Sequence, residues 1–94
     1  MDGFSARVDR QGDQITVSLQ GELDMAAAPT LEQLLTDLEG RICFDCTDLV
    51  FVDSSGLAIF ARVDRNGGAA LRAVRPNVRR VLEVAGLDRL ITDR

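Results

Sequence analysis

The run Asp53-Ser54-Ser55-Gly56-Leu57 places two hydroxyls and a carboxylate where extended chain is expected to become helix. It follows the apolar residues 49–52 and opens a helical pattern over residues 57–63. Serine and aspartate are favoured at helix N-caps, because their side-chain oxygens accept backbone N–H groups that the first turn leaves unpaired. A phosphate on one of the serines would face the same N–H groups and the positive end of the helix dipole. Taken alone, the run is more typical of a cap than of a phosphorylation site.

The composition excludes several classes of function. With 94 residues, 46% of them hydrophobic, the chain is expected to form one domain over residues 1–94. Its net charge of −4 argues against binding to nucleic acid or to an anionic membrane surface. The chain has no His, which excludes a Ser/His/Asp hydrolase, and no Gly-rich phosphate loop. No catalytic residue, metal or cofactor is therefore expected.

The N-terminal residues give no sign of a targeting segment. They contain no apolar signal region, and no apolar run in the chain is long enough to span a bilayer. A cytoplasmic protein without a membrane partner is expected.

Cys43 and Cys46 have the C-x-x-C spacing of redox and metal motifs. The surrounding residues, 41–46, are typical of a short strand, in which positions three apart point to opposite faces. In an extended chain their Cα atoms would be about 10 Å apart, whereas a disulfide requires less than about 7 Å. Two buried or half-buried thiols are the better interpretation, and a redox role is left open.

Hydrophobic periodicity predicts alternating strands and helices. Period-two alternation marks the strands, and apolar residues at i, i+3, i+4 and i+7 mark the helices. The predicted elements are a hairpin with strands at 4–8 and 15–19, a helix from Pro29 to Gly40, a strand at 41–46, a polar break at Thr47-Asp48, strand or turn at 49–52, a helix from 54 to 66, a strand at 69–74, a helix from Pro76 to Gly86 with Val78, Val81, Leu82 and Ala85 on its buried face, and a short apolar segment at 87–91. This order predicts an α/β fold with a mixed, mostly parallel sheet of four to five strands covered by helices.

Polar residues follow two of these strands. In open α/β sheets, functional residues gather at the carboxyl ends of the strands. Asp24 and the residues Asp53, Ser54 and Ser55 both occupy such positions. If the two strands are neighbours, these side chains share one surface, and phosphorylation of Ser54 becomes as well supported as capping.

Four segments together resemble STAS-domain anti-sigma factor antagonists in order and spacing. They are Gly21-Glu22-Leu23-Asp24, Ala28-Pro29, Phe51-Val52-Asp53-Ser54-Ser55-Gly56-Leu57 and Val81-Leu82-Glu83-Val84-Ala85-Gly86-Leu87. The resemblance covers nearly the whole chain. It implies a single STAS domain in a cytoplasmic bacterial protein that binds an anti-sigma factor and thereby releases a sigma factor, a form of transcription regulation.

The resemblance also implies partners and site residues. In this family the anti-sigma factor is a GHKL-type serine kinase that phosphorylates the Ser directly after the Asp, and a PP2C-type phosphatase reverses the modification. Carried onto this chain, the phosphoacceptor is Ser54, with Ser55 the less favoured alternative. The partner-binding residues are expected to be Asp24, Asp53, Ser54, Ser55, Gly56 and Leu57.

Some roles stay open on the sequence. Gly56 could allow close approach of a partner or serve only the turn, and Leu57 could be an exposed anchor or a core residue. The family usually continues past the last strand into a C-terminal helix, whereas this chain stops at Arg94. That helix is therefore expected to be missing, with one side of the sheet less covered.

Two other functions remain as alternatives. A STAS subunit of a lipid or anion transporter, or of a stressosome-like scaffold, would use the same surface for a permanent partner without phosphorylation. A phosphotransfer enzyme with an aspartyl acceptor would need clustered carboxylates for Mg²⁺ and a nearby Lys, and the chain has no Lys. The chain is not expected to be an enzyme.

Overall fold

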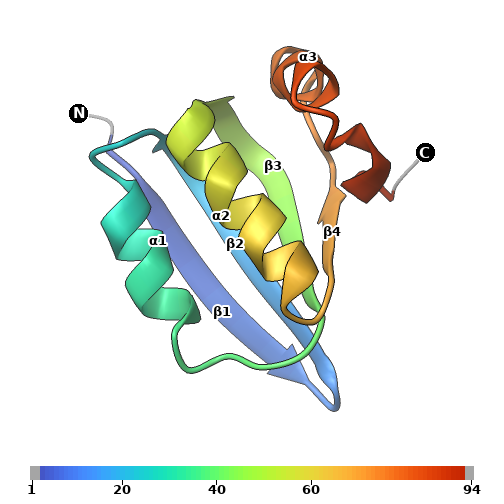
Figure 1. The fold of residues 1–94 in the computed structure, drawn as a ribbon. Coiled ribbons are helices and arrows are strands. Elements are labelled where there is room, and N and C mark those ends of the chain that lie inside the picture. The colour runs from blue at the N-terminus through green and yellow to red at the C-terminus, as the bar shows by residue number, and fades with distance from the viewer. Residues whose placement is uncertain (1–2, 93–94) are drawn as a thin grey trace.

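A computed structural model describes residues 3–92 of the chain. Its elements follow the predicted order, with a short 3₁₀ helix, η1, in the last predicted apolar segment (Figure 1). They are β1 (Ser5–Gln11), β2 (Gln14–Leu23), α1 (Ala28–Leu35), β3 (Ile42–Val52), α2 (Ser54–Arg65), β4 (Ala69–Arg72), α3 (Pro76–Val84) and η1 (Asp88–Leu90). The predicted α/β fold is confirmed.

The sheet has four strands in the order β1-β2-β3-β4. β1 is antiparallel to β2, and β2, β3 and β4 are parallel to one another. In the described residues a single bridge between Leu71 and Ile91 takes the place of a fifth strand. The mixed, mostly parallel sheet is therefore as predicted, and its strands number four.

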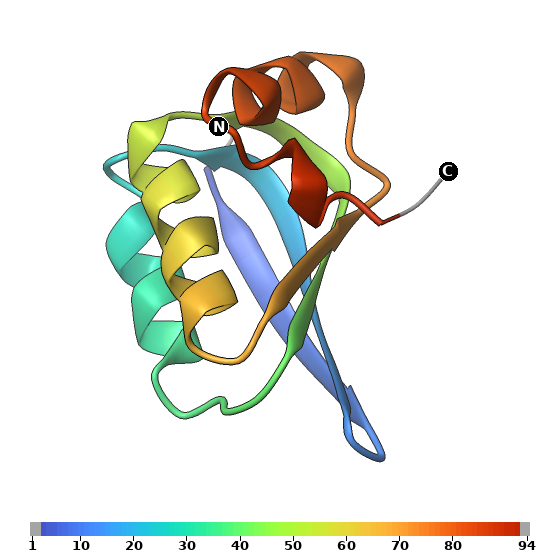
Figure 2. The same cartoon turned by 45° about the vertical axis from the view of Figure 1, so that its right-hand side comes forward.

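Two helices cover one face of this sheet. Figures 1 and 2 show α1 and α2 next to each other on that face and α3 across the end at which β3 and β4 finish. Between the two layers, Phe44 of β3 and Phe60 of α2 pack edge to face with their ring centroids 5.0 Å apart. On the opposite face, Arg7, Ser18 and Asp45 lie in register across three strands. Among residues 3–92 no helix covers that face or follows η1.

β3 is one continuous strand, and the predicted polar break at Thr47-Asp48 is wrong. The pairing of β2 with β3 shifts twice, once between Ser18 and Gln20 and again between Gly21 and Glu22. At each shift β3 contributes one residue more than β2, which is the geometry of a β-bulge. A bulge breaks the period-two alternation without ending the strand. The sequence pattern therefore indicates an end of the strand where the strand continues.

Two helix ends differ from the prediction. α1 stops at Leu35 instead of Gly40, because the Thr36 hydroxyl donates to the Glu32 carbonyl at 3.0 Å and the Leu38 amide turns back to the Leu35 carbonyl at 3.0 Å. α3 stops at Val84, and Ala85 is exposed instead of buried. The residues that α3 does bury are Val78 and Leu82, as predicted.

Both cysteines lie in β3 on opposite faces of the sheet, and neither forms a disulfide within residues 3–92. Cys46 is buried in the core on the same face of the sheet as Phe44, while Cys43 is half-buried on the other face. The prediction of two separate buried or half-buried thiols is confirmed.

Candidate functional site

The carboxyl ends of β2 and β3 bring the predicted site residues together. Leu23 and Val52 are paired across these neighbouring parallel strands. The Asp53 amide then donates to the Leu23 carbonyl at 3.2 Å, which ties the start of α2 to the end of β2. Asp24 therefore lies beside the run that begins at Asp53, as the sequence predicted for neighbouring strands.

Asp53 caps α2. Its backbone is extended, with φ of −114° and ψ of −169°, and its Oδ1 accepts the Ser55 amide at 2.8 Å and the Gly56 amide at 3.4 Å. The carboxylate thus satisfies two amides that the first turn would leave unpaired. The sequence left open whether Asp53 or one of the serines caps the helix. Asp53 does so, and neither serine side chain is needed for capping.

Ser54, the first residue of α2, is exposed. Its hydroxyl makes no hydrogen bond with any part of the chain that the structure describes. Ser55 is half-buried, and its amide is already bonded to Asp53. Of the two hydroxyls in this turn, the one on Ser54 is presented to the surroundings.

Asp24 holds the loop between β2 and α1. Its Oδ1 accepts the Ala27 amide at 3.0 Å, and its carbonyl accepts the Ala28 amide at 2.9 Å. The side chain is half-buried, as is that of Asp53. Both carboxylates are therefore held in place by backbone amides at the neighbouring ends of β2 and β3.

Gly56 is buried in the first turn of α2. A Cβ at this position would lie 2.5 Å from Val52 Cγ2 and 2.8 Å from Leu23 Cγ, closer than real side chains approach. The glycine therefore lets the helix start pack directly on the ends of β2 and β3. Leu57 is half-buried and packs against the core. The structure gives Gly56 a packing role, which the sequence had left open.

The turn presents a hydroxyl to which the described residues bond no catalytic group. No side chain in residues 3–92 is hydrogen-bonded to the Ser54 hydroxyl to act as a general base. In the same residues no group of three or more His, Cys, Asp or Glu could hold a metal ion. The turn offers an exposed hydroxyl, a helix dipole and two fixed carboxylates.

Comparison with known proteins places these features in a family. The family described as "Mlab, STAS domain" matches residues 6–92. The anti-sigma-B factor antagonist of Bacillus subtilis (strain 168) is 30% identical in an alignment that covers 89% of this chain and 84% of that protein. The chain belongs to the STAS-domain family of anti-sigma factor antagonists.

Solved structures of this family show the same fold. An anti-sigma factor antagonist from Mycobacterium paratuberculosis is 30% identical with a TM-score of 0.80, over 96% of this chain and 84% of that one. Unphosphorylated SpoIIAA is 23% identical with a TM-score of 0.83, over 96% of this chain and 88% of that one. The phosphorylated form of SpoIIAA from Bacillus is 22% identical with a TM-score of 0.74, over 96% of this chain and 91% of that one.

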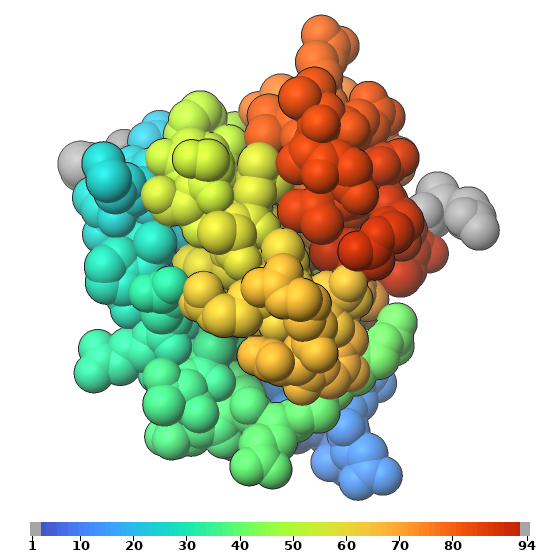
Figure 3. Space-filling model, in the orientation of Figure 1, coloured from blue at the N-terminus to red at the C-terminus, as the bar shows by residue number. Residues whose placement is uncertain are grey.

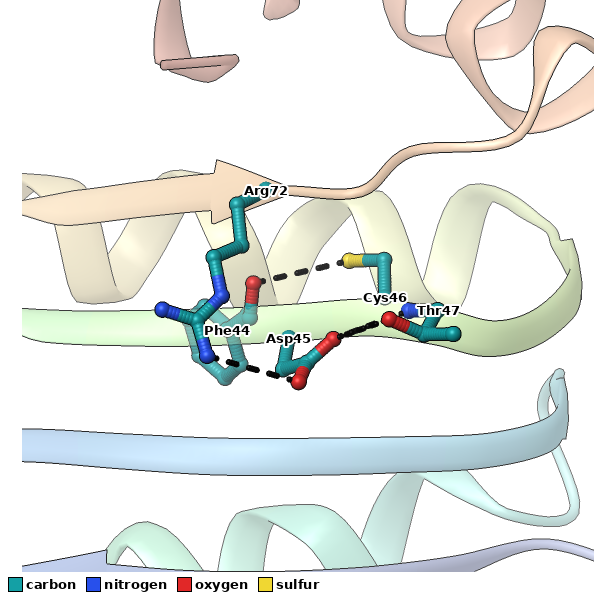
Figure 4. Close-up of polar contacts among 5 residues, drawn as sticks. All are labelled: Phe44, Asp45, Cys46, Thr47 and Arg72. Atoms are coloured by element: carbon teal, nitrogen blue, oxygen red, sulfur yellow. Dashed lines mark hydrogen bonds and ion pairs between the residues drawn. The ribbon is translucent and has the colours of Figure 1, made fainter. Parts of the chain in front are cut away.

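A second polar cluster of this STAS domain lies on the open face of the sheet. Asp45 accepts the Thr47 hydroxyl at 2.7 Å and the Thr47 amide at 3.0 Å, and Arg72 reaches its other oxygen at 3.4 Å (Figure 4). The Thr47 hydroxyl, helped by its amide and by Arg72, holds the pKa of the Asp45 carboxyl below its ordinary value of 3.8. The cluster joins β3 to β4 on the face opposite α2, so it belongs to the scaffold. Nothing in the spacing of these residues had indicated it.

The helices of this STAS domain are short. None of those in residues 3–92 combines the length and the apolar character that a bilayer crossing requires.

Proposed function

We propose that this chain, in its unphosphorylated form, binds an anti-sigma factor and thereby releases a sigma factor, and that phosphorylation of Ser54 switches it off. The observation that carries the proposal is the state of Ser54: because Asp53 caps the helix, the Ser54 hydroxyl is exposed and uncommitted. The 30% identity to anti-sigma factor antagonists supplies the class of partner.

Phosphorylation would act mainly through charge. The modification adds about −1.5 to −2 charges and a tetrahedral group. The helix dipole and the free Ser54 amide can accommodate this charge within the domain, whereas Asp24 and Asp53 are fixed close by and repel it. A partner surface packed over the turn would have to bury like charges together. A penalty of a few kcal/mol corresponds to orders of magnitude in affinity, since about 1.4 kcal/mol changes Kd tenfold.

Burial favours Ser54 over Ser55 as the acceptor. A kinase must reach the hydroxyl with its phosphoryl donor, and only Ser54 is exposed in this turn. We assign direct partner contact to Asp24, Asp53, Ser54, Ser55 and Leu57, all exposed or half-buried. Gly56, which is buried, contributes to the interface by positioning the turn.

The chain supplies the acceptor, and its partners supply the chemistry. Because Ser54 has no bonded base, a GHKL-type kinase activity of the anti-sigma factor would bring ATP and assist the attack. A PP2C-type phosphatase would remove the phosphate. The chain is then a regulatory protein of the cytoplasm, with neither an enzymatic activity nor a cofactor of its own.

Variants of Ser54 test the switch. Ser54→Asp introduces a negative charge at the acceptor and is expected to weaken binding to the purified anti-sigma factor at least tenfold. Ser54→Ala removes the hydroxyl, so it should bind as the unmodified protein does and accept no phosphate. Ser55→Ala is the matched control for the acceptor and is expected to keep accepting phosphate. Isothermal titration gives the affinities, and equal Kd values for Ser54→Asp and Ser54→Ala would rule out the switch.

The alternative is a STAS subunit of a lipid or anion transporter, or of a stressosome-like scaffold, that holds one partner permanently. The identity to anti-sigma factor antagonists and the uncommitted Ser54 hydroxyl favour the switch. A constant partner that binds both Ser54 variants equally would support the alternative.

A further inference from the structure

The exposed apolar side chains of this chain gather at one end of the molecule. In residues 3–92 the large apolar side chains that are exposed are Met25 (74% exposed), Val50 (39%), Phe51 (44%) and Val84 (87%). We call these four residues the apolar rim. Single exposed apolar residues are ordinary, but a concentration of them at one place is typical of a binding surface.

Two residues of the rim lie close in the chain to the site residues. Met25 directly follows Asp24, and Phe51 stands two residues before Asp53 at the end of β3. Glu22, the residue paired with Phe51, lies two positions before Asp24. Met25 and Phe51 therefore lie at the ends of the same two strands as the two carboxylates of the site.

Val84 belongs to α3, which lies at the same end of the molecule as the site. The start of α3 is held on β3 by the Asn77 side chain, which donates to the Val50 carbonyl at 2.8 Å, and by Arg75, which donates to the Thr47 carbonyl at 3.0 Å. Figures 1 and 2 show α3 at the same end of the molecule as the first turn of α2, and in Figure 3 their surfaces adjoin. Val84 lies in the last turn of α3, the helix whose surface adjoins that of α2.

Folding does not require this apolar surface. α3 buries Val78 and Leu82, and Val84 lies off that stripe. At the other end of the sheet, the Gly12-Asp13 turn, the 36–41 loop and the 66–68 turn include no exposed large apolar side chain among the described residues. The exposed apolar side chains are therefore found at the end of the molecule that carries Ser54, and packing of the core does not explain their exposure.

We propose that the apolar rim is the part of the interface that gives affinity, and that its occupant is an apolar surface of the anti-sigma factor. The inference rests on the function proposed above. Met25 and Val84 would both contact the partner, which would enclose the turn that carries Ser54. A phosphate on Ser54 would then lie inside a surface sealed from water by apolar contacts, where its charge is most costly.

The test replaces the rim without touching the switch. Met25→Ser and Val84→Ser each remove a side chain that would be buried on binding, so each is expected to raise Kd for the purified anti-sigma factor about tenfold. The double variant should raise it about a hundredfold, because the two residues lie on separate elements. Val84→Ala removes the same contact with no loss of helix propensity and should match Val84→Ser. In a kinase assay KM should rise and kcat should stay unchanged.

Controls separate this inference from the proposed function. Ala85→Ser, next to Val84, and Glu39→Ser, at the other end of the molecule, should bind as the unmodified chain does. The urea midpoints of the rim variants should equal that of the unmodified chain, because Met25 and Val84 are exposed. If the rim variants bind within twofold of the unmodified chain while Ser54→Asp does not bind, the rim inference is overturned and the switch stands. If the unmodified chain does not bind the anti-sigma factor, both the rim inference and the proposed function are wrong.

Discussion

Asp53, Ser54 and Gly56 lie within one turn of α2, and each meets a different environment. The Asp53 carboxylate is bonded to two amides, the Ser54 hydroxyl faces outward, and Gly56 is pressed against Leu23 and Val52. The sequence predicted a hydroxyl at a helix start. It could not assign the cap, since Asp and Ser are both favoured there. Only the positions of the oxygens relative to the amides distinguish the residue that caps from the residue that is free to be modified.

Asp45 gives a pH-dependent prediction at the scale of one residue. The Thr47 hydroxyl beside it, helped by Arg72, holds the pKa of this carboxyl below 3.8 in the folded chain. Because the folded pKa is below the unfolded one, the stabilisation is complete above the unfolded pKa and is lost as pH falls through the folded pKa. Asp45→Asn should therefore lower the free energy of unfolding at pH 7, by at most about 1 kcal/mol for a partly exposed pair. The difference from the unmodified chain should shrink as the pH falls below about 4.

Urea unfolding at a series of pH values measures this difference. Asp48→Asn is the matched control, because Asp48 is an exposed residue of the same strand. Its carboxylate makes no hydrogen bond or ion pair with any of residues 3–92. A difference between Asp45→Asn and the unmodified chain that is the same at pH 7 and pH 3 would contradict the assignment.

At the scale of elements, α2 is held on the sheet by the close approach at its first turn. Gly56→Ala would bring a Cβ to 2.5 Å from Val52 Cγ2, and neither Val52 nor Leu23 has room to move because both are buried. We expect this variant to lose about 1–3 kcal/mol of unfolding free energy, despite the better helix propensity of alanine. The measurement is the urea midpoint and slope.

The control for that substitution lies on the same helix. Ala58→Ser adds an atom at an exposed position of α2 and should change the unfolding free energy by less than about 0.5 kcal/mol. If Gly56→Ala is as stable as the unmodified chain, the first turn does not need the close contact with β2 and β3, and the packing role assigned to this glycine is wrong.

β3 shows where element prediction from sequence reaches its limit. Its two bulges put Thr47-Asp48 and Val50-Phe51 in places where strict alternation fails, so a single strand of 11 residues reads as a strand, a break and an uncertain segment. The same bulges turn Phe51 outward while Leu49 and Val52 stay in the core. Part of the apolar rim is therefore a product of strand irregularity that periodicity cannot anticipate.

At the scale of the whole molecule, the order of elements and the sheet type could be predicted because each element carries its own period. The meeting of Asp24 with Asp53 followed as soon as their strands were taken as neighbours, which the register confirms. The apolar rim could not be predicted, because it depends on α3 crossing the end of the sheet. One signal was present in the sequence: Val84 is apolar and lies off the stripe formed by Val78 and Leu82.

The domain as a whole separates its tasks between its two ends. The core and the open polar face stabilise the fold: Phe44 and Phe60 pack between the two layers, and Asp45 joins β3 to β4. The end that carries Ser54 concentrates the fixed carboxylates and the exposed apolar surface. A phosphate there would change one end of the molecule and leave the fold unaltered, so we expect a switch without refolding.

The most direct test of the central claim is to recover the protein from its own cells and separate the partner-bound pool from the free pool by gel filtration. Fragment-ion mass spectrometry then locates any phosphate in each pool. We expect phosphate on Ser54 in the free pool and none in the pool bound to the anti-sigma factor. Equal occupancy of Ser54 in both pools, or no phosphate under any growth condition, would contradict it.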